Sequence, residues 1–180
     1  ATFDLAHMLD DLAAGLETAN KRKILDALVE GRGTQGVLDE WSEVVRNAQL
    51  TVRISPASRY YLPELAELQH ASLMVDRAMR NARVLTRRAA TAIEHGTAPQ
   101  DITAALRRTS GAVRLLGHAL GDGQESLQAR KELTVVAAML TPKAHEGWHW
   151  QTLILIMRSL IVDLLQATGL SSQAASAHLG

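Results

Sequence analysis

The chain has 180 residues, equal numbers of basic and acidic side chains (19 Lys and Arg, 19 Asp and Glu) and no cysteine. Disulfides, thiolate nucleophiles and cysteine-based zinc sites are therefore excluded. The absence of a basic surplus argues against nucleic acid as a partner. Because aromatic residues make up only 3%, the core must be aliphatic, and a chain of this length can bury such a core as a single domain.

Residues 1–33 are predicted to form a pair of helices. Apolar residues recur at helical spacing over Asp4–Ala19, with acidic side chains near the start, where they suit a helix N-terminus. Asn20 is a good cap for a second helix over Lys21–Glu30, which Gly31 and Gly33 end.

The next segment, residues 34–170, is predicted to form the bundle core. It opens with an amphipathic helix over Gln35–Arg53, whose apolar stripe includes Trp41 as an expected core anchor. The Ser55-Pro56 pair then interrupts the helical pattern.

The longest uninterrupted stretch is Pro63–Gly96, which has no Pro or Gly between its ends. As a helix it would be about 50 Å long and would need partners along its length. One face is apolar and rich in alanine, and the opposite face carries Gln69, Asp76, Arg77, Arg80, Arg83, Arg87 and Arg88. That charged face either meets solvent or recognises carboxylates, for which guanidinium groups are well suited.

Three further helices are predicted, over Asp101–Leu120, Gln124–Leu140 and Leu153–Ala167, followed by a frayed tail over residues 171–180. The third is apolar nearly all round, as expected for a central helix, but too short and too charged to span a membrane. The fold class predicted for residues 1–180 is therefore a single all-α domain, a bundle of about six to eight helices organised around the long helix.

Two charged residues interrupt the apolar helix, Arg158 and Asp163. Buried charges need partners, because desolvation is costly when they are unpaired. We expect Asp163 to form a structural ion pair with an arginine of the long helix, Arg80 or Arg83. The alternative is a polar pocket for a small anionic ligand.

The segment His145-Glu146-Gly147-Trp148-His149 matches the H-E-x-x-H pattern of zinc hydrolases. Gly147 inside the motif, Pro142 just before it and the absence of a downstream glutamate favour a chance match in a loop. We therefore predict no metal, no cofactor and no enzymatic activity. The alternative is a zinc hydrolase that uses His145, Glu146 and His149. Trp148 and Trp150 are expected to cap the end of the bundle.

Two segments, Asp76–Gly96 and Arg158–Leu170, resemble the cytosolic domain of actinobacterial membrane proteins of the fusaric acid resistance and aromatic acid exporter group. The resemblance rests on the Arg-Asn-Ala-Arg-Val-Leu run at Arg80–Leu85 and the Asp-Leu-Leu-Gln-Ala-Thr-Gly run at Asp163–Gly169. It covers roughly residues 35–170.

The resemblance implies a partner, an N-terminal membrane domain of the same polypeptide located before Ala1, and a place at the cytoplasmic face of the cell membrane. It implies export of aromatic carboxylates, with this domain serving assembly, gating or substrate gathering. The predicted carboxylate-binding residues are Arg77, Arg80, Arg83 and Arg158. A homo-oligomer is left open, and the alternative function is that of a stand-alone helical ligand-sensing or scaffold protein.

Overall fold

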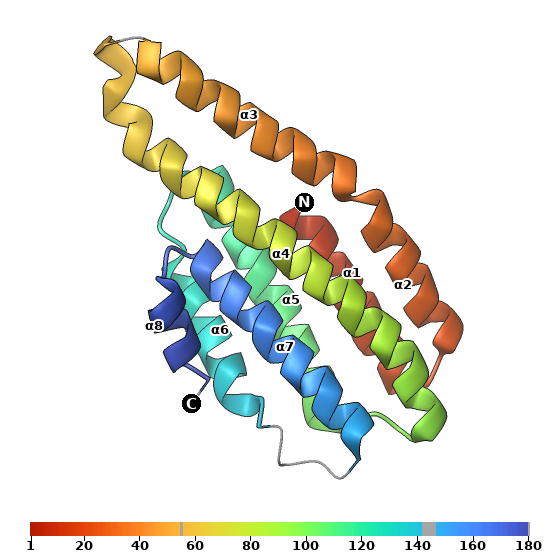
Figure 1. The fold of residues 1–180 in the computed structure, drawn as a ribbon. Coiled ribbons are helices and arrows are strands. Elements are labelled where there is room, and N and C mark those ends of the chain that lie inside the picture. The colour runs from red at the N-terminus through yellow and green to blue at the C-terminus, as the bar shows by residue number, and fades with distance from the viewer. Residues whose placement is uncertain (55, 142–146, 180) are drawn as a thin grey trace.

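The chain is helical throughout the part that the computed structural model describes, residues 1–54, 56–141 and 147–179. Those residues form eight α-helices and two short 3-10 turns, with no strand among them (Figure 1). The prediction of an all-α bundle is therefore confirmed.

Helices α1 (Thr2–Glu17) and α2 (Lys21–Gly33) form an antiparallel pair at the N-terminus (Figure 1). The side chain of Asn20 accepts a hydrogen bond from the backbone amide of Lys23 at 3.1 Å, which confirms the predicted cap.

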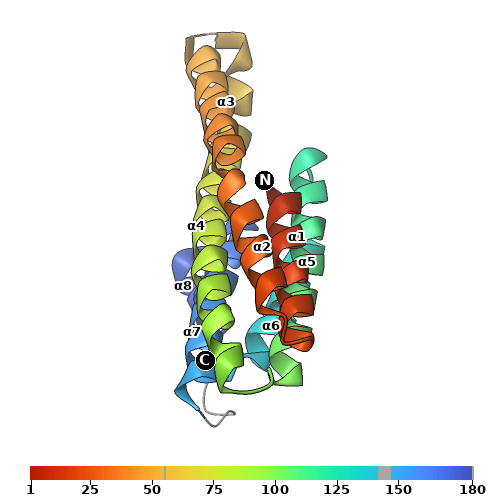
Figure 2. The same ribbon diagram turned by 90° about the vertical axis from the view of Figure 1, so that its right-hand side faces the viewer.

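Helices α3 (Gln35–Ile54) and α4 (Leu62–Ala92) are joined by the 3-10 turn η1 (Pro56–Tyr61). Pro63 lies in the first turn of α4. The N–H groups of a first turn have no acceptor within the helix, so a proline there costs no helical hydrogen bond. The outer part of α3, η1 and the first turns of α4 extend beyond the other helices as a two-helix arm (Figures 1 and 2).

The turn η2 (Ile93–His95) ends the long helix, and α5 (Gln100–Gly121) then returns along α1. The remaining helices are α6 (Leu127–Met139), α7 (Trp148–Ala167) and α8 (Ser172–Ala177). α6 packs between α5 and α7, and α8 packs on α7.

The core is organised around α4, which contacts α1, α2, α3 and α7. Its most extensive partner is α7, and small residues on α4 allow the two backbones to approach closely. The buried alanines of this face are Ala71, Ala78, Ala82 and Ala89. The aliphatic residues of α7 that fill the space opposite are Leu153, Met157, Leu160, Ile161 and Leu164, all fully buried.

Several predicted boundaries were wrong. Helix α2 continues beyond Glu30 to Gly33, and α6 begins at Leu127 and not at Gln124. Helix α7 begins at Trp148, five residues before the expected start at Leu153, because the buried Trp150 extends its apolar face. The tail is also more ordered than a frayed end. Ser171 caps α8 by accepting from the Ala174 amide at 3.2 Å, and Ala175 is fully buried.

Among the described residues, α7 is the one helix long and apolar enough to cross a membrane, with 20 residues and a mean hydropathy of 1.3. The sequence-based estimate of its length was too short. However, 56% of the apolar window is buried inside the protein, and the central helix of a soluble bundle meets the same criteria. The packing of α7 against α4 accounts for its composition.

Candidate functional site

Arg83 lies where α4 passes the junction between α2 and α3. Its Nε donates to the Gly31 carbonyl at 2.8 Å, and its Nη1 donates to Gln35 Oε1 at 2.9 Å. Its Nη2 lies 3.4 Å from the Thr34 hydroxyl. Arg83 thus satisfies a carbonyl in the last turn of α2 and does not meet Asp163, for which it was considered as a partner.

The surroundings of Arg83 make this cation dependent on its hydrogen bonds. Burial lowers the pKa of its guanidinium, the negative charge of Asp76 opposes this, and the positive charges of Arg80 and Arg32 add to it. Arginine stays protonated in proteins, so the half-buried charge must be held by acceptors. We therefore assign Arg83 to the structure of the helix junction.

Two other arginines also hold helix ends. Arg158 on α7 donates to the carbonyl of Leu140, the C-cap of α6, at 2.7 Å, and to the carbonyl of Leu179 after α8. Arg130 on α6 donates to the hydroxyl and the carbonyl of Thr168, the C-cap of α7. These contacts join the start of α6 to the end of α7, and the ends of α6 and α8 to the middle of α7.

The predicted ion pair between Asp163 and Arg80 is wrong. Asn81 Nδ2 donates to Asp163 Oδ2 at 2.7 Å, whereas Arg80 pairs with Asp76 one turn earlier on its own helix. Arg80 is 66% exposed, because it points away from α7. Burial raises the pKa of the Asp163 carboxyl, and the Asn81 hydrogen bond and the positive charge of Arg77 oppose that rise.

The four arginines predicted to bind a carboxylate do not converge on one site. Arg83 and Arg158 donate to backbone carbonyls on different helices. Arg77 and Arg80 are both exposed on α4, where the charge of Arg77 acts on Asp163 and Arg80 pairs with Asp76. Recognition of a carboxylate by Arg77 and Arg80 stays a prediction.

A cleft of about 430 Å³ lies between the first half of α4, the α5–α6 connection and the end of α7. Its lining includes Glu64, Glu67, Glu125, His70 and Arg130. The volume suits a small molecule. Three carboxylates against one arginine, itself bound to a helix end, favour a cationic or neutral polar ligand over an organic anion.

A second cleft, of about 320 Å³, lies beside the first and is mainly apolar. Val37 and Trp41 of α3 face Leu68 of α4 and Leu120 of α5 across it. Leu68 and Leu120 line both clefts, so a polar and an apolar compartment adjoin. Trp41 is only half buried here, so the predicted core anchor also forms a wall of this cleft.

The zinc-hydrolase pattern lies partly outside the described residues, because His145 and Glu146 fall in the undescribed segment 142–146. Its last member, His149, lies in the first turn of α7. Its ring stacks on that of His95, with centroids 3.8 Å apart and planes 13° apart.

The two tryptophans of this region differ in exposure. Trp150 is buried and packs on the core, whereas Trp148 is 64% exposed and lies against the His149 ring. Only Trp150 therefore fulfils the predicted capping role. Desolvation lowers the pKa of His149, and the neighbouring His95 lowers it further.

One group of potential metal ligands occurs among the described residues. The ligand atoms of His7, Asp11 and Glu30, on α1 and α2, lie within 4.8 Å of one another. No local signal in the sequence joins these three residues, because Glu30 lies far along the chain from the i,i+4 pair formed by His7 and Asp11.

Two other residues of structural importance were also missed, Asn81 and Arg130. Asn81 had a signal in the sequence, since it lies three residues after Ala78 and four before Leu85 on the buried face of α4. Arg130 had none, because its partner Thr168 lies 38 residues away in the chain.

The chain is 25% identical to an uncharacterized protein of Corynebacterium glutamicum over 183 residues. The match covers 97% of this chain and 47% of that protein, so the chain spans about half the length of this relative. No protein-family model and no solved structure matches the chain. These comparisons assign no activity.

Proposed function

We propose that this chain is the cytoplasmic domain of a membrane protein of the fusaric acid resistance and aromatic acid exporter type, where it serves assembly, gating or substrate gathering. The observation that carries the proposal is the composition of the arm tip. We define the arm tip as Arg53, Ile54, Arg59, Tyr60 and Tyr61, at the far end of α3 and in η1.

The arm tip combines exposed apolar, aromatic and cationic side chains. Ile54 is 84% exposed and Tyr60 is 85% exposed, and Arg53 and Arg59 beside them are exposed as well. Tyrosine is enriched where proteins meet the membrane–water interface, and arginine is attracted to anionic lipid headgroups. The arm tip therefore has the chemistry of a surface that lies at a membrane.

Two further observations support the proposal. The segments that resemble the exporter group lie on α4 and α7, the two helices that form the centre of the bundle. About half of the Corynebacterium protein has no counterpart in this chain, a length sufficient for several membrane helices.

The coding sequence that adjoins this chain tests the exporter proposal directly. We expect several apolar segments of about 20 residues each, the length that spans a bilayer. A hydropathy scan that finds none would contradict the proposal.

Binding to lipid vesicles tests the role of the arm tip. We expect the purified chain to sediment with vesicles that contain phosphatidylglycerol, and the double variant Ile54→Ser, Tyr60→Ser to bind about tenfold more weakly, because apolar contact area is lost. Val29→Ser, which alters a 65% exposed valine on α2, is the matched control and should bind as the wild type does. Binding by the double variant that equals that of the wild type would show that the arm tip does not contact the membrane.

The alternative, a stand-alone ligand-sensing or scaffold protein, is favoured by one observation, the adjoining polar and apolar clefts. An adjoining coding sequence without membrane segments would make this the better proposal. A ligand with an amine beside an apolar group would then match the two linings.

A further inference from the structure

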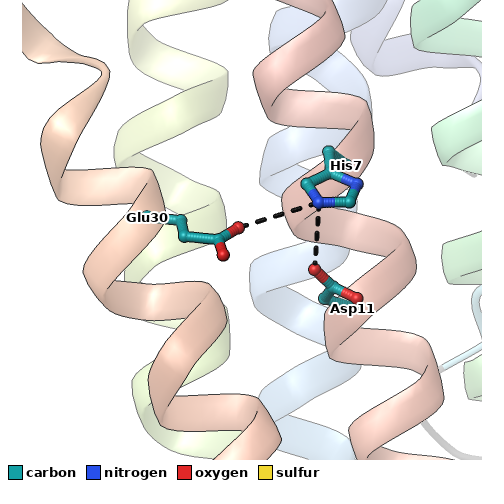
Figure 3. Close-up of side chains that lie close together, drawn as sticks. All are labelled: His7, Asp11 and Glu30. Atoms are coloured by element: carbon teal, nitrogen blue, oxygen red, sulfur yellow. Dashed lines mark ion pairs between the residues drawn. The ribbon is translucent and has the colours of Figure 1, made fainter.

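His7, Asp11 and Glu30 converge between the first two helices (Figure 3). His7 Nε2 lies 3.4 Å from Asp11 Oδ2 and 3.8 Å from Glu30 Oε2. His7 and Asp11 are one turn apart on α1, and Glu30 reaches across from α2 (Figure 3).

The helix spacing at this level is set by buried packing. Met8 and Gly31, the chain neighbours of His7 and Glu30, are buried between α1 and α2. A Cβ atom at Gly31 would overlap the Met8 thioether, so the two helices approach as closely as this pair allows. The three ligand side chains therefore extend from two helices that are packed against each other at this level.

The donor set and its spacing fit a transition-metal ion. One imidazole nitrogen with two carboxylate oxygens is a combination that zinc accepts, with bonds of about 2.0–2.2 Å. Ligand atoms around a tetrahedral ion with such bonds lie about 3.4 Å apart. The two imidazole–carboxylate separations of 3.4 and 3.8 Å are close to this value, and the two carboxylates lie within 4.8 Å of each other.

We infer that His7, Asp11 and Glu30 form a binding site for a divalent transition-metal ion such as zinc. Water would complete the coordination, because the side chains of His7 and Glu30 are more than half exposed. The ion would join α1 to α2. This inference is independent of the proposed function.

Lys23 competes with the ion. Its Nζ lies 3.7 Å from Asp11 Oδ1, so its positive charge already neutralises part of the site. Replacing Lys23 by methionine removes that charge and keeps most of the side-chain length. We expect Lys23→Met to bind zinc more tightly than the wild type does.

Calorimetric titration of the chelator-treated full chain with zinc chloride tests the site. We expect the wild-type chain to bind one zinc ion at this site. His7→Ala should weaken binding at least about tenfold, since even outer-shell partners of a metal ligand contribute that much. His149→Ala is the matched control, because His149 stacks on His95 and offers a competing imidazole pair.

Glu30→Gln separates the loss of a metal ligand from the loss of the fold. It removes the charge at an exposed position and leaves the shape of the side chain almost unchanged. It should weaken zinc binding while the circular dichroism spectrum stays that of the wild type. Binding that survives both His7→Ala and Glu30→Gln, or that only His149→Ala abolishes, would overturn the inference. So would the absence of binding to the wild type.

Discussion

Three arginines of this protein hold helix ends. Arg83, Arg130 and Arg158 each donate to a backbone carbonyl at the end of α2, α7 or α6. The last carbonyls of a helix have no partner within it, and the fork of the guanidinium group can reach several acceptors at once. An arginine stripe in a sequence can therefore reflect helix–helix connections as readily as a ligand site.

The contrast between Arg83 and Arg80 can be measured. We expect Arg83→Met to lower the free energy of unfolding by about 2 kcal/mol, because the Gly31 carbonyl and the Gln35 amide lose a charged donor. Arg80→Met should cost less than about 0.5 kcal/mol, since its pair with Asp76 is on the surface. Urea unfolding of both variants measures the two losses in the free energy of unfolding. Equal losses would refute the structural role of Arg83.

Asp163 should affect stability in a pH-dependent manner. Its pKa is raised in the folded protein, so the native state holds this proton more tightly than the unfolded chain does. Stability from this group is therefore present below the ordinary aspartate pKa and is lost as the pH rises through the raised value.

Asp163→Asn removes this loss and keeps an oxygen acceptor for Asn81. We expect the variant to equal or exceed the wild type in stability at pH 7, and its advantage to shrink as the pH falls toward 4. Urea unfolding across that range measures this. A variant clearly weaker than the wild type at pH 7 would show that the charge of Arg77 outweighs the burial of the carboxylate.

At the scale of elements, α1 and α2 pack closely because Gly15 of α1 faces Ile24 of α2. A Cβ atom at Gly15 would come within 2.5 Å of the Ile24 Cγ1 and 3.2 Å of its backbone nitrogen. The side chain could rotate, but the backbone nitrogen belongs to a helix and cannot move alone. The two helices would have to separate.

We expect Gly15→Ala to destabilise the protein by about 1–3 kcal/mol, the usual cost of overpacking. Gly111→Ala in α5 is the matched control, because open space surrounds that position. At that position the higher helix propensity of alanine should raise the free energy of unfolding by at most about 1 kcal/mol. Thermal unfolding compares the two, and similar shifts in Tm would contradict the packing argument.

Most helices could be predicted from the sequence because their signals are local. The Asn20 cap and the apolar periodicity of α5 required no knowledge of the rest of the chain. The start of α7 and the existence of α8 could not be predicted in this way, since both depend on packing: Trp150 and Ala175 are buried against other helices.

The side-chain pairs were harder to predict than the helices. The sequence placed Asp163 opposite α4, but Asn81 and Arg80 differ by 100° around that helix. Only the rotation of α4 against α7 decides which of them meets the carboxylate. The group formed by His7, Asp11 and Glu30 likewise depends on how two helices are aligned.

At the scale of the whole molecule, the arm changes how the apolar stripe of α3 is used. Trp41 of this stripe was predicted to be a core anchor, yet it is only half buried, and of the valines near it Val37 and Val44 are exposed whereas Val45 is buried. α3 packs mainly on α4, and its outer part lies beyond the other helices (Figure 2). Amphipathic periodicity predicts that a face is apolar, whereas the arrangement of the neighbouring helices decides whether anything covers it.

The continuity of α4 has a mechanical consequence. This helix runs without interruption over 31 residues from the arm to the centre of the bundle, a rod of about 47 Å. A tilt of about 5° at one end displaces the other by about 4 Å over that length. Glu64 and Glu67, near its outer end, line the polar cleft, and Asn81 near its middle is bonded to α7. A molecule bound in the cleft would therefore contact the same continuous helix that leads to the arm and that packs on α7.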